Sequence, residues 1–266
     1  MEVSVQIDRA SASLLAKLIA ADPDDSFDDT LLAWLKTCLY FDGLTSIAYF
    51  DDSNPIALQL WSAHSETHSL MGTEYLNLAY LLDPFYNLHV QKRPEGVYRL
   101  MDVAPDQFNR TQYYNEYYRF TGTTDEIGML FRPAEGMTVI TSLDRNRRSL
   151  RRFSQSDLGT INTISPILSA LGKKRYGAIS TGKRHKELSI KDTLTQALRR
   201  NHAISLSPRQ TEVALLVLKG HSSNSIGSIL GISPQTVKVF RKQIYRRCNI
   251  GSQAELFKLL LPLIGS

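Results

Sequence analysis

Three basic residues near the end of the chain recur at helical spacing. Lys238, Arg241 and Lys242 fall on one stripe of a predicted helix that begins at Ser233, because positions three and four apart share a helix face. Apolar residues from Val237 onward form the adjacent stripe, which predicts a buried side that holds the helix in place. Long cationic side chains on such a helix can contact the phosphates and base edges of a duplex. The pattern therefore indicates double-stranded DNA as a partner.

Further helices are needed to position this one. A serine, a proline and a glutamine within 207–210 have the order of a capped helix start, and Gly220 ends that helix. A second helix begins at about Ser223, and a fourth begins at a capping box over 252–255. Two short helices joined by a glycine-containing turn form a helix-turn-helix. The alternative, a solvated charged face on an ordinary four-helix bundle, explains the capped helices and the charge segregation less well. We expect an all-α, four-helix helix-turn-helix domain.

Charge is distributed unevenly along the chain. Residues 1–172 contain 14 Lys and Arg against 22 Asp and Glu, a net charge of −8, whereas residues 173–266 contain 17 against 4, a net charge of +13. An acidic body joined to a basic tail favours a polyanion partner for the tail. A basic stretch without apolar periodicity over 171–189 indicates a linker. We expect a small-molecule sensor and dimerisation domain up to residue 172, a linker over 173–203 and a DNA-binding domain over 204–266.

Composition narrows the class of protein. The 266 residues are 42% apolar, enough for one large domain or two ordinary ones. The two cysteines, Cys38 and Cys248, lie far apart in sequence, which fits a reduced, cytoplasmic protein. The first residues lack the pattern of a leader, and no stretch of about eighteen apolar residues indicates a membrane span. We therefore expect no membrane partner.

Catalytic and metal-binding signals are weak. His64 and His68, with Glu66 between them, could bind zinc if a helix placed both histidines on one face, but no third ligand lies at a useful spacing. The chain has no G-x-S-x-G and no H-E-x-x-H, and Cys38 lies within an apolar helix pattern. The sequence therefore predicts no enzyme, no metal site and no cofactor.

The segment from Leu206 to Leu261 resembles the LuxR-type helix-turn-helix of bacterial transcription regulators. The positions that fit its pattern are Pro208, Arg209, Glu212, Gly220, Ile226, Leu230, Ile232, Ser233, Thr236, Val237, Lys238, Ile244 and the run Gln253-Ala254-Glu255-Leu256. The resemblance implies that the third helix reads bases and that its start contacts phosphates. The candidate DNA-binding residues are Ser233, Gln235, Thr236, Lys238, Val239, Arg241 and Lys242.

The chain departs from that pattern at three positions. Ser225 stands where an acidic residue is usual, Gly227 where alanine is usual and Phe240 where histidine is usual. The first change weakens an internal salt bridge, with Arg209 or a neighbour. The last exchanges a polar residue for a core aromatic. Both can alter stability or orientation without removing DNA binding.

The first two thirds of the chain mixes predicted helices with predicted strands. The helices cover 27–40, 73–82, 105–120 and 156–171, and the strands cover 46–50, 56–62, 96–101 and a hairpin over 126–133 and 138–145. This order indicates an α/β domain, an α-β-α sandwich with a PAS/GAF-like antiparallel sheet. A phosphorylated receiver is disfavoured because Asp51-Asp52 fits a hairpin turn. An ATPase is disfavoured because the GxxxxGK[ST] motif is missing.

Residues 75–86, with Asp83-Pro84, make this part resemble the autoinducer-binding domain of LuxR-type regulators. In quorum-sensing members the matching aspartate accepts a hydrogen bond from the ligand amide, and the resemblance implies that role for Asp83. The surrounding positions depart from the pattern, since Leu70, Glu74 and Tyr98 stand where Trp, Tyr and Trp are usual. We expect a small-molecule effector other than a standard acyl-homoserine lactone. The candidate ligand-binding residues are Trp61, Tyr75, Tyr80, Asp83, Phe85 and Tyr98.

Tyrosines are concentrated in this region. Eight of the twelve lie between Tyr75 and Tyr118, which suits a pocket for an amphiphilic ligand or an aromatic core. A core is favoured for the four tyrosines within 113–118, while both interpretations stay open for Tyr75, Tyr80 and Tyr98.

Together these patterns predict a ligand-responsive transcription regulator. Binding to DNA as a homodimer is expected because one small helix-turn-helix contacts too little duplex for tight specific binding. The predicted helix over 156–171 and the helix over 256–263 are the expected dimer surfaces. Two alternatives stay open: an acyl-homoserine lactone receptor, and a ligand-independent regulator whose front domain binds a protein partner.

Overall fold

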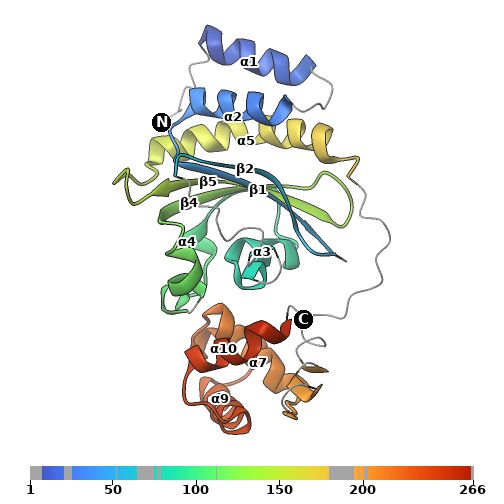
Figure 1. Ribbon diagram of the computed structural model, residues 1–266, viewed down its shortest axis with the longest axis vertical. Helices are drawn as coiled ribbons and strands as arrows, with labels where there is room; N and C mark the ends of the chain where they lie inside the picture. The colour runs from blue at the N-terminus through green and yellow to red at the C-terminus, as the bar shows by residue number, and fades with distance from the viewer. Residues whose placement is uncertain are drawn as a thin grey trace. The chain divides into compact units, whose positions relative to one another are not determined.

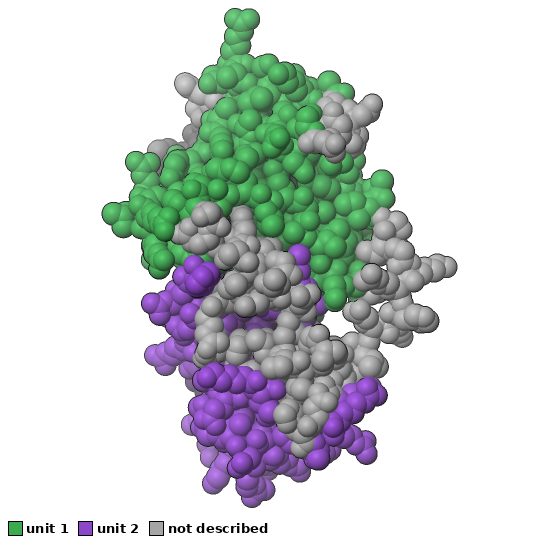
Figure 2. Space-filling model, viewed as in Figure 1, with its two compact units in different colours: residues 1–69, 88–103, 121–184 green, residues 70–87, 104–120, 185–266 purple. Residues whose placement is uncertain are grey.

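A computed structural model describes most of the chain (Figure 1). The described residues are 8–20, 26–51, 53–64, 75–76, 79–111, 113–179, 195–196, 198–200 and 203–264. They pack as two compact units (Figure 2). Unit 1 is drawn from Met1–Ser69, Leu88–Val103 and Thr121–Arg184, and unit 2 from Leu70–Asn87, Ala104–Phe120 and His185–Ser266. The domain boundaries expected from the sequence stay a prediction.

Unit 1 is built on a five-stranded antiparallel sheet. The strands are β1 (Gly43–Phe50), β2 (Ile56–Ser62), β3 (Gly96–Arg99), β4 (Thr123–Phe131) and β5 (Met137–Asn146), in the spatial order β2-β1-β5-β4-β3. Every residue of the central strand β5 is buried. The predicted hairpin is confirmed as β4 and β5, and the predicted strands at 46–50 and 56–62 are confirmed as β1 and β2.

Helices α2 (Phe27–Cys38) and α5 (Gln155–Tyr176) cover one face of the sheet (Figure 1). Apolar side chains of the strands alternate toward them, so that Leu44 and Ala48 of β1 share a core with Trp34 of α2 and Ile161 of α5. Helix α5 begins at a capping box formed by Ser154 and Asp157. Helix α1 (Arg9–Ala20), which the sequence analysis did not predict, packs on α2. The predicted α/β fold is confirmed.

Several connecting elements differ from the prediction. The predicted helix over 105–120 is instead a short 3₁₀ helix, η3 (Phe108–Arg110), and a π-helix, η4 (Tyr113–Tyr118). The predicted strand over 96–101 ends early, since Leu100–Val103 forms α4. Within the predicted helix over 73–82 the described part contains the 3₁₀ helix η2 (Ala79–Leu82), and the rest lies outside the described residues.

Local hydrogen bonds explain the break between η3 and η4. The Thr111 hydroxyl donates to the carbonyl of Phe108 at 2.7 Å and accepts from the amide of Tyr114 at 3.0 Å. A threonine side chain that bonds its neighbouring backbone competes with continuous helix. A further helix, α3 (Pro84–Val90), was not predicted; it starts at Asp83, whose Oδ1 accepts from the amide of Phe85 at 2.8 Å.

The C-terminal helices follow the sequence prediction closely. They are α7 (Pro208–Lys219), α8 (Ser223–Leu230), α9 (Pro234–Cys248) and α10 (Gln253–Ile264). The predicted capping box of Ser207 and Gln210 is present, and Gly220 and Gly231 end their helices in the left-handed conformation. The all-α helix-turn-helix prediction is confirmed. Among the helices that the structure describes, none is long and apolar enough to cross a membrane.

A buried acidic pair lies where β5 ends. Asp144 and Asp42 are both buried, and among the described residues Oδ1 of Asp144 has no hydrogen-bond partner. Burial, followed by the nearby charge of Asp42, raises the pKa of Asp144 to about 7. Because its pKa in the unfolded chain is about 3.9, Asp144 stabilises the folded state fully only below that pH. This contribution is lost as the pH rises from there through about 7.

Replacing Asp144 with asparagine should remove this pH dependence, since the amide carries no charge to bury. We expect the free energy of unfolding at pH 8 to rise by roughly 4 kcal/mol and to change little near pH 4. Urea unfolding at the two pH values measures both effects. Asp102→Asn, on the exposed surface of α4, is the control and should show neither. An Asp144→Asn protein with the wild-type pH dependence would contradict the assignment.

Candidate nucleic-acid interface and sensor site

Helix α9 is held by one side and free on the other. The Ser233 hydroxyl caps its start by accepting from the amide of Thr236 at 3.0 Å. Val237, Ile244 and Cys248 are buried, as the periodicity predicted. The helix therefore has a fixed orientation within the four-helix group, which a recognition element needs.

All seven candidate DNA-binding residues lie between the N-cap of α9, Ser233, and Lys242. Ser233, Gln235, Lys238, Val239 and Lys242 are exposed, while Thr236 and Arg241 are half-buried. Val239 keeps 47% of its surface accessible, although an apolar side chain gains nothing from water. Arg241 is partly engaged, because its Nη2 lies 3.4 Å from the Tyr245 hydroxyl. The structure thus brings the predicted set together on one surface; its role in DNA binding stays a prediction.

A polar network that the sequence analysis did not identify orients α9 against α7. Gln210 of the capping box is buried, and its Nε2 donates to Oε1 of Gln243 at 2.9 Å. Arg247 donates from Nη1 to Oε1 of Gln210 at 3.1 Å and to the carbonyl of Ser205 at 2.8 Å. Buried polar groups with several partners specify one packing arrangement. Only the helix packing reveals that Gln210 serves both as a cap and as this link.

The three departures from the helix-turn-helix pattern have local explanations. Ser225 shares a hydrogen bond of 2.9 Å with Nδ1 of His221, in place of an ion pair. Arg209 instead pairs with Glu212 at 2.9 Å and donates to the carbonyl of Leu230. Phe240 is half-buried. A Cβ on Gly227 would lie 2.8 Å from the Ile232 carbonyl oxygen, so this glycine lets α8 approach the turn closely.

Asp83 is the centre of a buried hydrogen-bonded cluster in unit 2. The Tyr75 hydroxyl donates to its Oδ2 at 2.5 Å and the Phe85 amide donates to Oδ1, and the Tyr113 side chain interacts with the same carboxylate. Burial raises the pKa of Asp83, and these hydrogen bonds oppose the rise. The structure therefore joins two of the predicted ligand residues, Tyr75 and Asp83, with Tyr113. From its sequence, Tyr113 was expected to belong to an aromatic core, and no sequence signal links it to Asp83.

The remaining candidate ligand residues pack locally. Tyr80 meets Tyr86 edge-to-face, with ring centroids 4.9 Å apart, and Phe85 is buried at the start of α3. Trp61 packs edge-to-face on Phe41 at 5.7 Å, beneath the Lys36 ammonium at 3.7 Å.

Tyr98 and Trp61 both belong to unit 1. The Tyr98 hydroxyl donates to the carbonyl of Pro94 at 2.7 Å, and Trp61 joins the core on the α2 side of the sheet. The structure does not place either of them in the cluster of Asp83.

The four tyrosines within 113–118 were expected to form a core. Phe108 is the hub of this group, with ring centroids 6.0 Å from Tyr113, 5.4 Å from Tyr114 and 5.8 Å from Tyr118. Phe108 and Tyr113 are buried, which supports the core interpretation for this part of the cluster.

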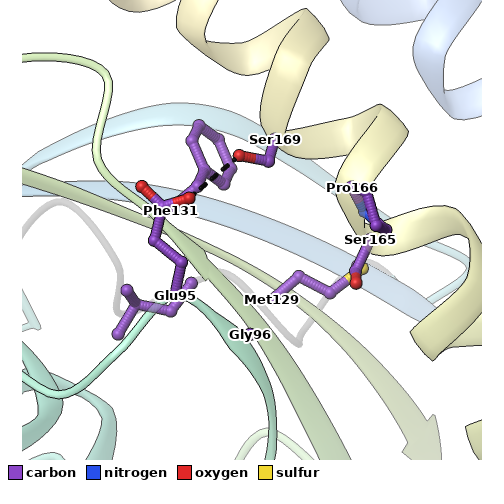
Figure 3. A pocket seen from close by; sticks show the side chains of 8 residues that line it. Glu95, Gly96, Met129, Phe131, Ser165, Pro166 and Ser169 are labelled. Atoms are coloured by element: carbon purple, nitrogen blue, oxygen red, sulfur yellow. Dashed lines mark hydrogen bonds between the residues drawn. The ribbon is translucent and has the colours of Figure 1, made fainter.

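A separate pocket of about 280 Å³ opens in unit 1 between the β3–β4 edge and α5 (Figure 3). Its charged group, the Glu95 carboxylate, already accepts hydrogen bonds from Lys173 at 2.8 Å and Ser169 at 3.3 Å, the latter drawn in Figure 3. It also accepts from the amide of Arg132 at 3.0 Å. A small pocket whose polar group is satisfied by the protein offers a ligand little specificity.

The histidine pattern at 64–68 is only partly described. Glu66 and His68 lie outside the described residues, while Nδ1 of His64 lies 3.4 Å from Nη1 of Arg148. Within the described part of the chain no group of three or more His, Cys, Asp or Glu is arranged to hold a metal ion.

Comparisons with known proteins match both parts of the chain. Residues 204–260 match the family model described as bacterial regulatory proteins, luxR family. A putative HTH-type transcriptional regulator in the exeN 3′ region of Aeromonas salmonicida is 31% identical over 186 residues, which is 67% of this chain and 93% of that protein. The crystal structure of the VqsR LBD domain from Pseudomonas aeruginosa aligns over 65% of this chain and all of its own, with 26% identity and a TM-score of 0.55. Escherichia coli SdiA aligns over 96% of this chain and 97% of its own, with 15% identity and a TM-score of 0.45.

Proposed function

This chain belongs to the luxR family of bacterial regulatory proteins, and from that premise we propose that it is a ligand-responsive regulator that binds its operator as a homodimer in the cytoplasm. Its relatives are DNA-binding transcription regulators rather than enzymes, and its front part has the fold of an autoinducer-binding-like domain. Ligand responsiveness, dimerisation and location are the proposed steps beyond that. The effector we propose is a small molecule other than a standard acyl-homoserine lactone.

The DNA-binding part of the proposal is supported by the surface of α9. Lys238 and Lys242 project one helical turn apart from a helix whose opposite side is buried. Exposed Val239 between them offers an apolar contact of the kind that reads a thymine methyl group. Two such helices in a dimer would address two half-sites of an operator.

The ligand part of the proposal is carried by the cluster at Asp83. In the quorum-sensing members that this chain resembles, the matching aspartate accepts from the ligand amide. Here the carboxylate already accepts from Tyr75 and the Phe85 amide, and the Tyr113 side chain interacts with it. A carboxylate has about four acceptor positions, so one donor from a ligand can still be accommodated. The proposed difference from a lactone therefore rests on the departures at Leu70, Glu74 and Tyr98.

Within unit 2 the same cluster is continuous with the end of α7. Tyr113 contacts Phe108, and the segment around Phe108 bonds to α7, since the amide of Gln107 donates to the Gly220 carbonyl at 3.0 Å. The amide of Ser222 donates to Asp106 at 2.9 Å. A ligand that moved Tyr113 would therefore bias the arrangement of the 106–111 segment and the start of α8. Such a bias is the differential interaction that ligand control requires.

A second contact ties α7 to the region of Asp83. Nζ of Lys219 donates to Oδ1 of Asn87 at 2.7 Å, and burial lowers the pKa of Lys219 to about 8. Asn87 lies on α3, the helix that Asp83 starts. The 106–111 segment and helix α3 are thus both hydrogen-bonded to the C-terminal end of α7.

Native mass spectrometry tests the proposed ligand. The purified protein is measured alone and after incubation with a mixture of acyl-homoserine lactones and cell extract. A retained mass of a few hundred daltons that is lost in Asp83→Ala supports a sensor. Retention of a lactone would contradict the proposed ligand class, and a dimer without any retained mass would favour a ligand-independent regulator with a protein partner.

Gly220 offers a test of the contact between the 106–111 segment and α7. Its φ of +96° is left-handed, and a Cβ there would lie 2.6 Å from Cγ2 of Thr111. Gly220→Ala should lower the free energy of unfolding by about 2 kcal/mol, measured by thermal and urea unfolding. Gly231→Ala is the matched control, because that position has a φ of +64° and open space around it. It carries the backbone strain alone, so equal losses in the two variants would argue against the Thr111 contact.

A further inference from the structure

The turn between β5 and α5 concentrates positive charge in an otherwise acidic part of the chain. Arg147, Arg148, Arg151 and Arg152 are all exposed within the six residues 147–152, which we name the arginine turn. These four supply a large share of the 14 basic residues in a segment whose net charge is −8. At the tip of the turn Leu150 is 92% exposed.

Two features of the arginine turn cost folding free energy, and a third contributes nothing to it. Like charges this close repel one another. Leu150 exposes a large apolar side chain, and its φ of +53° is left-handed, a conformation that leucine rarely adopts. Residues and backbone conformations that oppose folding stability are expected to gather at functional surfaces.

The turn is held in a defined shape. Asn146 is the anchor: its amide donates to the buried Asp42 at 2.8 Å, and its side-chain oxygen accepts from the amide of Arg148 at 3.1 Å. The Ser149 hydroxyl donates to the Asn146 carbonyl at 2.8 Å, and the amide of Arg147 donates to the Gly122 carbonyl at 2.8 Å. Because the backbone is tied at four points, the arginines project from a preorganised support.

In the part of the chain that the structure describes, no carboxylate forms an ion pair with Arg147, Arg151 or Arg152. Arg151 lies over the ring of Tyr40, 5.7 Å from its centroid, and Arg148 is bonded to His64. Planar guanidinium groups exposed in this way suit two-pronged binding of phosphate.

We propose that the arginine turn is a second DNA-contacting surface that binds the sugar–phosphate backbone without regard to sequence. The proposal rests on the proposed function, because a duplex held by α9 is present near the rest of the chain at a high effective concentration. That tethering favours DNA over other polyanions. Leu150, exposed at the tip of the turn, adds an apolar contact with the sugars of the same backbone.

Salt dependence of DNA binding tests this surface without knowledge of the operator. The probe is a mixed-sequence duplex of about 40 base pairs, bound by the full chain at several salt concentrations. In the triple variant Arg147→Gln, Arg151→Gln, Arg152→Gln we expect the slope of log affinity against log salt to fall by about 2 to 3 for each bound protomer. Affinity near 0.1 M salt should fall roughly tenfold.

A matched control separates local contact from general charge. Arg9, Lys17 and Arg93 are also exposed cations of unit 1, and replacing all three with glutamine removes the same charge. In the control variant, the slope of log affinity against log salt should differ from the wild-type slope by less than about one. An equal change in both variants, or an unchanged slope in the turn variant, would overturn the proposal. The wild-type protein could instead float with phosphatidylserine vesicles while the turn variant does not, with DNA binding equal in both. The partner of the turn would then be a membrane surface and not DNA.

Leu150→Gly gives a readout that a structural role would not produce. Glycine relieves the left-handed strain, so we expect the thermal midpoint to stay equal or rise while DNA affinity falls several-fold. A fall in stability with unchanged affinity would assign Leu150 to the fold and count against the proposal. A wild-type protein that bound no duplex even at low salt would overturn the proposed function as well. Normal wild-type binding with a failed turn prediction would overturn only the arginine turn.

Discussion

Replacing Lys238 and Lys242 together with alanine should reduce operator affinity by roughly two to three orders of magnitude and leave the fold intact. Both side chains are exposed on α9, so their loss disturbs no packing. Each cation that contacts a base edge or phosphate contributes about 1–3 kcal/mol, and two such losses in each protomer add up. Footprinting on a selected operator measures the loss, and circular dichroism checks that the helices persist.

The control for this variant removes two cations from unit 2 away from α9. Arg200 and Lys258 are exposed and lie before α7 and on α10. Arg200→Ala with Lys258→Ala removes the same charge and should change affinity by less than about tenfold, mainly through long-range electrostatics. An unchanged footprint in the Lys238→Ala, Lys242→Ala variant would show that α9 is not the recognition helix. Equal losses in both variants would reduce its role to general attraction.

The recognition helix could be predicted because its signals are local. Gly231, Ser233 and Pro234 mark its start within four residues, and one stripe of apolar residues fixes its buried side. Each of these signals acts through a neighbour one helical turn away. The same holds for the hairpin of β4 and β5, whose strands are joined by a short turn.

Elements whose geometry depends on distant partners were missed or misplaced. Residues 105–120 have the composition of one helix, yet Thr111 diverts the backbone and the rings around Phe108 support a π-helix instead. The face of strand β2 on which Trp61 lies could likewise not be predicted from the local sequence. The register of β2 shifts beside Ser46 and Ile47, and such an irregularity decides which face a side chain occupies.

The partner of Asp83 was also beyond the reach of sequence patterns. Asp83 stood out through its resemblance to a known motif, but Tyr113 follows it thirty residues later in a run of similar tyrosines. Nothing in that run distinguishes Tyr113 as the tyrosine whose side chain interacts with the buried carboxylate. The distinction arises only when η4 is folded against η2, which ends just before Asp83, and it has a measurable consequence for stability.

Replacing Asp83 with alanine should lower the free energy of unfolding by about 3 kcal/mol. Two buried donors, the Tyr75 hydroxyl and the Phe85 amide, lose their acceptor, and the Tyr113 side chain loses its interaction with the same carboxylate; each orphaned donor costs about 1–3 kcal/mol. The raised pKa of Asp83 shows that burying its carboxylate costs folding free energy. The variant no longer has this cost, which offsets part of the loss. Urea unfolding at neutral pH measures the change, and Asp102→Ala on the exposed surface of α4 is the control.

The orphaned hydroxyls make this prediction specific, because removing them should restore part of the stability. Replacing both partners of a buried hydrogen bond costs much less than replacing one. We therefore expect Tyr75→Phe and Tyr113→Phe, added to Asp83→Ala, to recover at least about 1 kcal/mol, although each is neutral or harmful in the wild-type chain. If the triple variant were no more stable than Asp83→Ala, the loss would come from the cap of α3 alone. The tyrosines would then be free to serve a ligand, and the cluster would be an open site instead of one that the protein itself fills.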